Sequence, residues 1–315
     1  MNVLQSLDEL AEWRRSLAAP VGVAIGAFDG VHIGHQYLLR TLRDWADEAG
    51  GRAVAMTFEP HPLAVLAPSQ APRLLTSLED KLALFAGLGL DTASVIEFTR
   101  EFAALTPEEF MRLVIRDVLG ASYVIVGFNF TFGAFGRGRP EDLVRAGPEL
   151  GFETVVAPPV CVGDAYVSST SIRAAVARGA VEEAAVMLGR PYRLPVAALK
   201  TAAGAGDGSH LCNGTADARF AIPRTGVYAG QLKIDGQASE VAVLVDHAGE
   251  GGTVKIVSTR RGTPEPGVAL WARLSLAPEE VVAHPEAALA AAREKIASLA
   301  LEDEPAVQVP GKTAL

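Results

Sequence analysis

This 315-residue sequence has few cysteines, no long apolar run and no excess of basic residues. Its two cysteines, Cys161 and Cys212, stand far apart without a ligand spacing, which argues against a disulfide framework and against a zinc site. No run approaches the roughly 18 apolar residues that a membrane-spanning helix needs. The formal net charge of −9 argues against a protein that coats nucleic acid, because phosphate neutralisation requires a basic face.

The first residues also lack the basic and then apolar order of a secretory signal, since Asp8, Glu9 and Glu12 fall among them. We therefore expect a cytoplasmic protein with no membrane partner. The rest of the composition is that of an ordinary globular protein, with 49% hydrophobic and 21% charged residues. A chain of this length is long enough for two domains, each with its own core. The sequence leaves the oligomeric state open.

The first half alternates short apolar runs with segments of helical period. The runs are brief, rich in β-branched residues and bounded by turn residues, which predicts buried strands at 21–26, 52–58, 92–98, 122–128 and 152–157. Between and after them, helical periodicity predicts helices at 35–49, 78–88, 107–119, 140–150, 170–178 and 181–188. This alternation predicts an α/β domain with a Rossmann-like, mostly parallel sheet that binds ligands beyond the carboxyl ends of its strands.

The pattern changes near residue 190. Strand-like runs at 226–234, 239–245, 253–259 and 268–276, separated by Gly, Asp and Pro, predict a small antiparallel β-barrel or sandwich. Residues 285–299 have the pattern of one closing C-terminal helix, and residues 201–214 that of a loop. We therefore expect one domain over residues 1–190, a second over residues 191–302 and a flexible tail over residues 303–315.

The junction between the first strand and the first helix, Gly26–His35, carries the clearest chemical signal. Glycine lets the backbone approach a phosphate closely, and a helix start offers unpaired N–H groups with a partial positive charge, so we expect an anion to bind here. His32 and His35, with Gly34 between them, can both face that anion. They can stabilise the negative charge that builds up on a leaving pyrophosphate, and no protein nucleophile is then required.

This junction resembles the HxGH signature of the nucleotidylyltransferase superfamily. In its extended form, GAFDGVHIGHQ, it is similar to the FMN adenylyltransferase module of the bacterial bifunctional riboflavin kinase/FAD synthetases. HxGH alone also occurs in other nucleotidyltransferases, so the resemblance depends on three further segments. These are TFEPHP at 57–62, GFNFTFG at 127–133 and VSSTSIR at 167–173. The resemblance spans about residues 15–192.

The resemblance implies a role for each motif. The implied catalytic residues are His32, His35 and Arg173. ATP binding falls to a set of small and polar residues, namely Gly26, Phe28, Asp29, Gly30, Gly34, Ser168, Ser169 and Thr170. Flavin binding falls to Phe58, Pro60, His61, Pro62, Asn129 and Phe130. The implied reaction is direct, in-line transfer of AMP from ATP to FMN, which yields FAD and pyrophosphate, with Mg²⁺ arriving on the ATP.

In this family the barrel that follows is a riboflavin kinase, and Gly226–Ala229 fits its GVYA strand. The family's GFPTAN motif corresponds to NGTAD here, in which Thr215 is kept and Asp217 replaces Asn; these two residues are the metal ligands if the kinase is active. The family's catalytic Glu has no counterpart in the run TVKIV at 253–257, and no GxRPTF loop is present. The sequence therefore predicts that kinase activity is absent or much reduced.

Two other functions stay open at this stage. One is the complete bifunctional enzyme, which also converts riboflavin to FMN and which a carboxylate beside Thr215 would favour. The other is a flavin-binding regulatory protein that keeps the pocket without turnover. The sequence also does not distinguish FMN from a modified flavin, or ATP from CTP. All these functions involve small molecules, and none involves nucleic acid.

Overall fold

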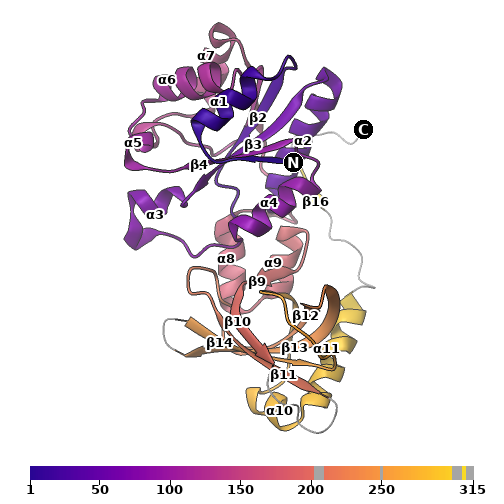
Figure 1. Cartoon of the computed structure of the whole chain (residues 1–315). Coiled ribbons are helices and arrows are strands. Elements are labelled where there is room, and N and C mark those ends of the chain that lie inside the picture. Colours follow the sequence, from indigo (N-terminus) through magenta and orange to yellow (C-terminus); the bar gives the residue numbers. More distant parts are fainter. Residues whose placement is uncertain (202–208, 249–250, 300–306, 310–315) are drawn as a thin grey trace. The chain divides into compact units, whose positions relative to one another are not determined.

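The computed structural model describes residues 1–201, 209–248, 251–299 and 307–309 (Figure 1). The chain divides into two compact units. The first consists of Met1–Pro72, Leu78–Cys161 and the residues from Gln308 onward, and the second consists of Arg73–Ser77 and Val162–Val307. The division into compact units places the two helices before residue 190 with the C-terminal sheet. The domain boundary expected at residue 190 stays a prediction.

Six parallel strands form the sheet of the first unit, in the order β1-β4-β3-β2-β5-β6. Their bounds are Asn2–Leu4 for β1, Val21–Ile25 for β2, Arg52–Glu59 for β3, Thr92–Glu97 for β4, Tyr123–Gly127 for β5 and Glu153–Ala157 for β6. From β2 the chain runs outward to β3 and β4, then returns to β5 on the other side of β2. The strand order therefore reverses between β2 and β5, which is where sheets of this kind bind ligands. The predicted Rossmann-like sheet is confirmed.

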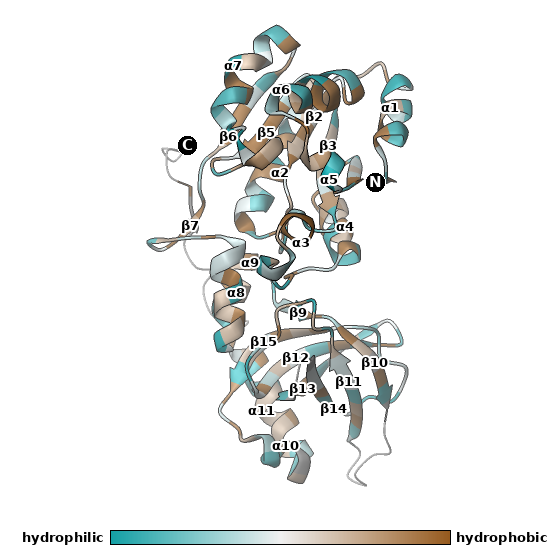
Figure 2. Cartoon of the chain, turned by 90° about the vertical axis from the view of Figure 1, so that its left-hand side faces the viewer, coloured by the Kyte–Doolittle hydropathy of each residue, from teal (hydrophilic) through white to brown (hydrophobic). Residues whose placement is uncertain are grey.

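Helices cover both faces of this sheet. They are α1 (Leu7–Arg15), α2 (Ile33–Ala49), α3 (Pro62–Leu66), α4 (Leu78–Gly87), α5 (Arg100–Ala103), α6 (Pro107–Glu109) and α7 (Pro140–Leu150), with the short 3₁₀ turns η1 (Pro68–Gln70) and η3 (Ala134–Gly136). The predicted helix at 107–119 continues from α6 as the π-helix η2 (Phe110–Val118). One core holds Leu10 of α1 and Leu143 of α7, and the other holds Leu39 of α2 and Phe85 of α4. Burial on both faces explains the continuous apolar strands, which Figure 2 colours largely brown.

The second unit contains one antiparallel sheet of seven strands, in the order β10-β11-β14-β13-β12-β15-β9, curled into a nearly closed barrel. The bounds are Tyr192–Leu194 for β9, Val196–Thr201 for β10, His210–Ala216 for β11, Gly226–Ile234 for β12, Gln237–Ala248 for β13, Gly251–Ser258 for β14 and Val268–Leu274 for β15. Its helices are α8 (Ser169–Arg178), α9 (Val181–Leu188), α10 (Pro278–Ala283) and α11 (Pro285–Leu299). Leu289 and Ile296 of α11 pack on Val227 and Ala242, so the predicted closing helix belongs to the barrel core.

Two expectations about loops were wrong. Residues 210–214 lie in strand β11 rather than in a loop, because they pair with both β10 and β14, and ladder pairing outweighs a weak local preference. The glycine-rich run at 204–208 lies outside the described residues. In the expected tail, Val307–Gln308 forms strand β16 of a small third sheet with β7 (Cys161–Val162) and β8 (Ala165–Tyr166).

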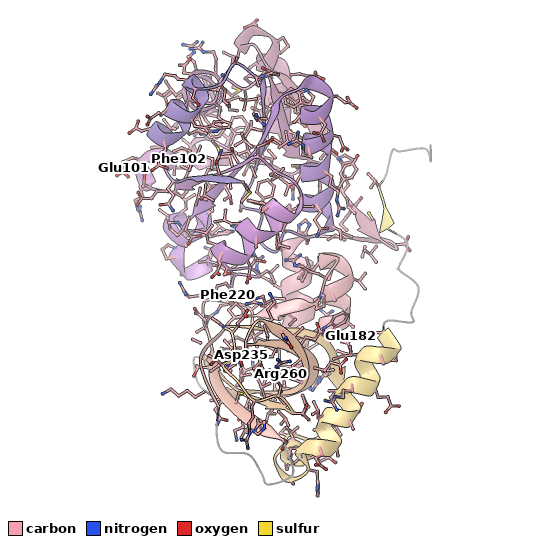
Figure 3. All side chains as sticks on the ribbon, turned by 45° about the vertical axis from the view of Figure 1, so that its right-hand side comes forward. Glu101, Phe102, Glu182, Phe220, Asp235 and Arg260 are labelled. Atoms are coloured by element: carbon pink, nitrogen blue, oxygen red, sulfur yellow. The ribbon has the colours of Figure 1, made fainter. Side chains whose placement is uncertain are left out.

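The second unit also takes in the short segment Arg73–Ser77, which the sequence did not predict. The N–H of Leu74 donates to the carbonyl of Arg219, and the N–H of Ala221 donates to the carbonyl of Leu74, both at 2.8 Å. Within the same unit, Glu182 of α9, labelled in Figure 3, accepts a 2.9 Å hydrogen bond from the N–H of Arg273 in β15. Within the described part of the chain, no helix is both long and apolar enough to span a bilayer.

Candidate active site

The loop that follows β2 has an unusual backbone. Phe28, Gly30 and Val31 all have positive φ, at 49°, 86° and 40°, and two of these residues carry side chains that disfavour this region. The N–H of Val31 donates to the carbonyl of Phe28 at 3.1 Å, which closes the turn. Phe28 and Val31 are both buried, and the Phe28 ring meets the rings of His35 and Phe85 edge-on. The surrounding core therefore maintains a strained loop, a common property of functional sites.

His32 and His35 lie together at the start of α2. Their rings are stacked, with centroids 3.6 Å apart and planes 18° from parallel. His32 is the N-cap residue of the helix, because its Nδ1 accepts a hydrogen bond from the N–H of His35 at 3.3 Å. A neutral His32 in this role carries its proton on Nε2, which makes Nε2 a hydrogen-bond donor. Gly34 permits the arrangement, since a Cβ at that position would lie 3.2 Å from the His32 ring.

The first turn of α2 carries no acidic residue. By contrast, α4 has Glu79 and Asp80 in its first turn, and α7 has Glu141 and Asp142. Acidic side chains at those positions compensate the positive end of a helix dipole. No such side chain does so at α2, which leaves the start of this 17-residue helix suited to a phosphate group.

Three of the predicted motif segments meet at one edge of the sheet. Strands β3, β2 and β5 are neighbours and run parallel, so the loops after them emerge on the same side. After β3, His61 caps α3 through a 3.2 Å hydrogen bond from the N–H of Leu63 to its Nδ1. After β5, Asn129 is exposed and Phe128 is 49% exposed. The structure thus places the His32–His35 pair, the Pro60–Pro62 turn and Asn129 in loops at the carboxyl ends of neighbouring strands.

The predicted flavin-binding phenylalanines have different environments. Phe58 is only 8% exposed and packs on Phe98 and Phe102, with centroids 5.6 and 5.8 Å away; Phe102 is labelled in Figure 3. Phe130 is half-buried and stacks on Phe132. These five rings pack on other rings rather than forming a free surface, and we call them the aromatic wall. The flavin contacts assigned to Phe58, Pro60, His61, Pro62, Asn129 and Phe130 stay predictions.

A buried lysine lies under the segment Gly26–His35, which we call the phosphate loop after its expected ligand. This lysine was missing from the predicted site. Lys81 of α4 is 6% exposed, and its Nζ donates to the carbonyl of Ala27 at 2.9 Å and to Oγ1 of Thr57 at 3.3 Å. Burial lowers the pKa of this ammonium, whereas the neighbouring charges of Asp29 and Glu59 act to raise it. Charged helix residues are usually exposed, so the sequence contained only a weak signal, namely that Lys81 shares a helix face with Phe85.

The VSSTSIR motif lies in the second unit, at the start of α8. Ser168 is the N-cap residue and forms a capping box with Ser171, and Ser169 and Thr170 occupy the first turn. Nε of Arg173 donates to the carbonyl of Arg73 at 2.7 Å, within the same unit. This helix start also has no acidic residue in its first turn. The contacts of Ser168, Ser169, Thr170 and Arg173 with a triphosphate stay predictions.

The candidate metal ligands of the barrel are Thr215 and Asp217, and Asp217 is already paired with a basic side chain. Asp217 accepts hydrogen bonds from Nε and Nη2 of Arg219, the latter at 2.6 Å, and this guanidinium lowers the pKa of the carboxyl. Thr215 lies opposite Thr253, and Asp246 lies opposite Thr253 on the other side. Two strand spacings, roughly 9–10 Å, therefore separate the backbones of Thr215 and Asp246. In the described parts of the chain, no three His, Cys, Asp or Glu side chains gather as a metal site would require.

Comparison with known proteins agrees with the motifs. The family model for FAD synthetase matches residues 15–171. The bifunctional riboflavin kinase/FMN adenylyltransferase of Bacillus subtilis is 35% identical over 222 residues, which is 68% of each chain. The protein of the same name from Pseudomonas fluorescens is 33% identical over 258 residues, which is 80% of each chain.

The chain belongs to the bifunctional riboflavin kinase/FMN adenylyltransferase family. Its FAD synthetase module includes the phosphate loop, the TFEPHP turn and the GFNFTFG loop, and ends at Ser171 inside the VSSTSIR motif. The fold is also that of a crystal structure named as a macrolide-efflux protein from Streptococcus pneumoniae, which aligns with a TM-score of 0.76 and 23% identity over 93% of this chain and 98% of that chain. At that identity the likeness concerns the fold alone.

Proposed function

We propose that this chain transfers AMP from ATP to FMN and releases pyrophosphate, so that its product is FAD. The observation that carries the proposal is the stacked His32–His35 pair at the start of α2, beside the point where the strand order reverses. A phosphate oxygen of FMN forms a bond to the α-phosphorus of ATP. The bond from that phosphorus to the oxygen bridging to the β-phosphate breaks, and its electron pair leaves with pyrophosphate.

The residues of the phosphate loop supply charge and position rather than a covalent intermediate. The Nε2–H of His32 and the ring of His35 meet the charge that develops on the leaving pyrophosphate, and the start of α2 adds its partial positive charge. Mg²⁺ belongs to the substrate, as MgATP, and neutralises part of the triphosphate charge. On the acceptor side, exposed Asn129 is suited to hydrogen-bond the flavin, with the aromatic wall around Phe58 and Phe130 behind it. The resemblance of VSSTSIR to the family's motif supports a triphosphate contact for Arg173 and the start of α8.

We also propose that the barrel does not phosphorylate riboflavin in this chain. The ion pair with Arg219 supports this, because Asp217 must leave its guanidinium partner before it can bind a metal. The two-strand separation between Thr215 and Asp246 supports it too, since a general base must be within hydrogen-bond reach of the hydroxyl that it deprotonates. In β14, Lys255 stands in the run where the family carries its Glu.

The second candidate is the complete bifunctional enzyme, which the names of the relatives and the retained barrel fold favour. It differs in one product. A bifunctional enzyme makes FMN and then FAD from riboflavin, whereas the proposed enzyme makes FAD only when FMN is supplied.

The test is to incubate the purified protein with MgATP and FMN, to separate the flavins by chromatography and to measure pyrophosphate in the same samples. We expect FAD and pyrophosphate to form in a one-to-one ratio. A parallel sample with MgCTP reports the nucleotide preference, and we expect ATP to be favoured. Binding of FMN with neither product would overturn the proposal in favour of a regulatory flavin-binding protein.

A further inference from the structure

Lys81, Thr57 and the carbonyl of Ala27 form a closed triangle of hydrogen bonds under the phosphate loop. Nζ of Lys81 donates to both of the other groups, at 2.9 and 3.3 Å, and the hydroxyl of Thr57 donates to the carbonyl of Ala27 at 3.1 Å. Thr57 has no exposed surface and Lys81 has almost none. The triangle therefore joins three separate parts of the first unit, namely the phosphate loop, the end of β3 and helix α4.

A buried ammonium is costly to solvate with protein groups alone, and lysine is rarely buried without a specific partner. On α4, Lys81 shares its buried face with Phe85, where a leucine or methionine would pack without that cost. The charges of Asp29 and Glu59 offset part of it and favour the protonated form. The contacts of Nζ point to a purpose for the charge, because the shortest of them ends on the backbone of the phosphate loop.

The carbonyl that Lys81 holds belongs to the peptide between Ala27 and Phe28. In a planar trans peptide the C=O and the following N–H point in opposite directions, so fixing the carbonyl of Ala27 also fixes the N–H of Phe28. Phe28 is in the left-handed region at φ 49°, a conformation that a bulky residue keeps only when its surroundings enforce it. The Phe28 ring in turn meets His35 at 5.3 Å. A chain of contacts thus runs from Lys81 through Phe28 to the histidine pair.

We infer that Lys81 is a positioning residue for adenylyl transfer, whose ammonium holds the Ala27–Phe28 peptide and thereby keeps His35 stacked on His32. The kinetic part of this inference rests on the proposed function. The structural part does not, because the order of the phosphate loop can be measured without turnover. Lys81 itself touches neither reacting phosphate in this account.

The experiment compares Lys81→Met, which keeps the length of the side chain and removes its charge, with Lys81→Arg, which keeps a cation. Thr57→Val removes a second corner of the triangle, and Thr57→Ser is its matched control because it keeps the hydroxyl. Lys233→Met, at an exposed position in β12, controls for loss of a lysine elsewhere. Two quantities are measured for each variant: amide hydrogen exchange in the peptide covering residues 26–35, and kcat and KM for FAD formation from FMN.

We expect Lys81→Met to speed exchange in residues 26–35 by about 10-fold or more and to lower kcat roughly 100-fold, since misplacement of catalytic groups acts on the transition state. KM for FMN stays within about threefold, because none of the residues assigned to flavin binding forms a hydrogen bond of the triangle. Thr57→Val shows smaller changes in the same direction, and Lys81→Arg recovers part of kcat. Thr57→Ser lies closer to the wild type than Thr57→Val does, and Lys233→Met matches the wild type.

Unchanged exchange and unchanged kcat in Lys81→Met would overturn the inference. A lowered melting temperature with kcat intact would overturn it equally, since that outcome describes a purely structural lysine. If Lys81→Met does not fold, Thr57→Val decides, and wild-type exchange in that variant counts against the inference. If the wild-type protein makes no FAD, the proposed function fails, while the exchange measurement still decides whether Lys81 orders the loop.

Discussion

The phosphate loop of the first unit and the end of β11 in the barrel each carry a motif of the family, yet they differ in how closely their side chains match it. In the phosphate loop the stacked histidines, the permissive Gly34 and the start of α2 form one consistent anion site. At the end of β11, Asp217 is paired with Arg219. The barrel fold is nonetheless complete, and Tyr228 of its GVYA strand is fully buried with its hydroxyl on the carbonyl of Arg224.

This contrast separates residues that a fold needs from residues that a reaction needs. Tyr228 fills the core and satisfies a backbone carbonyl, so its loss would destabilise the barrel whatever the barrel does. A catalytic carboxylate on an exposed strand position has no such role, and it can be exchanged without harm to the sheet. A barrel can therefore keep its shape whether or not it keeps its chemistry.

The largest effect should come from the phosphate loop. Replacing His32 and His35 together with Ala removes the side chains that meet the charge on pyrophosphate, and we expect kcat/KM for FAD formation to fall about 1,000-fold. His284→Ala, at an exposed position after α10, is the matched control and should leave kcat/KM unchanged. Turnover within threefold of wild type in the double variant would remove the phosphate loop from the mechanism.

Arg173 should have the next largest effect. Its replacement by Ala is expected to raise KM for MgATP and to lower kcat/KM by about 30-fold, since a cation that binds phosphate contributes through charge-assisted hydrogen bonds. Arg178→Ala, on the same helix, removes an exposed arginine that is paired with Glu183 and serves as the control. Equal kinetics in the two variants would contradict the role assigned to Arg173.

Two aspartates should differ in their contribution to stability. Asp91 accepts hydrogen bonds from the N–H of Ala53, from Arg43 and from Arg52, whereas the side chain of Asp217 accepts them from one described residue, Arg219. We expect Asp91→Asn to lower the free energy of unfolding by about 1–3 kcal/mol and Asp217→Asn by less than about 1 kcal/mol. Urea unfolding at pH 7 measures both.

The same pair gives a pH dependence. Burial acts to raise the pKa of Asp91, but the N–H of Ala53 and the guanidinium of Arg43 outweigh it and hold the pKa below its usual value. A depressed pKa in the folded state stabilises the protein above the unfolded pKa, about 3.9, and this stabilisation is lost as the pH falls through the folded value. The difference between wild type and Asp91→Asn should therefore shrink in acid. A difference that grows there would show that the sign is wrong.

The smallest effect is expected in the barrel. Thr215→Ala and Asp217→Ala should leave FAD formation from FMN within about twofold of wild type, because neither residue belongs to a motif assigned to adenylyl transfer. Both proteins are assayed with FMN and with riboflavin in parallel. A riboflavin-dependent product that disappears in either variant would show that the barrel is active.

Much of this organisation followed from the sequence, because its elements follow simple periods. Strand β12 and helices α7, α9 and α11 have the predicted bounds, since binary patterning and turn residues mark their ends clearly. The edge strand β1 was not predicted, because three residues carry too little pattern. The π-helix η2 was not distinguished from an α-helix, because π-helices are rare and are defined by a hydrogen-bond pattern that the sequence does not display.

The sequence predicted the motifs of the candidate site, but it did not predict the buried lysine that contacts the phosphate loop. The sequence predicted that His32 and His35 lie together, because both residues stand in one recognisable string, and their role in catalysis stays a prediction. Lys81 was missed because its importance comes from burial, which sequence patterns assign to apolar residues. The insertion of Arg73–Ser77 into the second unit was missed for a related reason, since its hydrogen bonds to Arg219 and Ala221 join residues far apart in the chain.

The most direct test of the difference between the two sites uses both flavins in one sample. Unlabelled FMN and isotopically labelled riboflavin are supplied together with excess MgATP, and the flavins are analysed by mass spectrometry. An active adenylyltransferase beside a silent barrel predicts that all FAD is unlabelled and that the labelled riboflavin is recovered unchanged. Labelled FMN or labelled FAD would contradict a silent barrel, and the absence of any FAD would contradict the active phosphate loop.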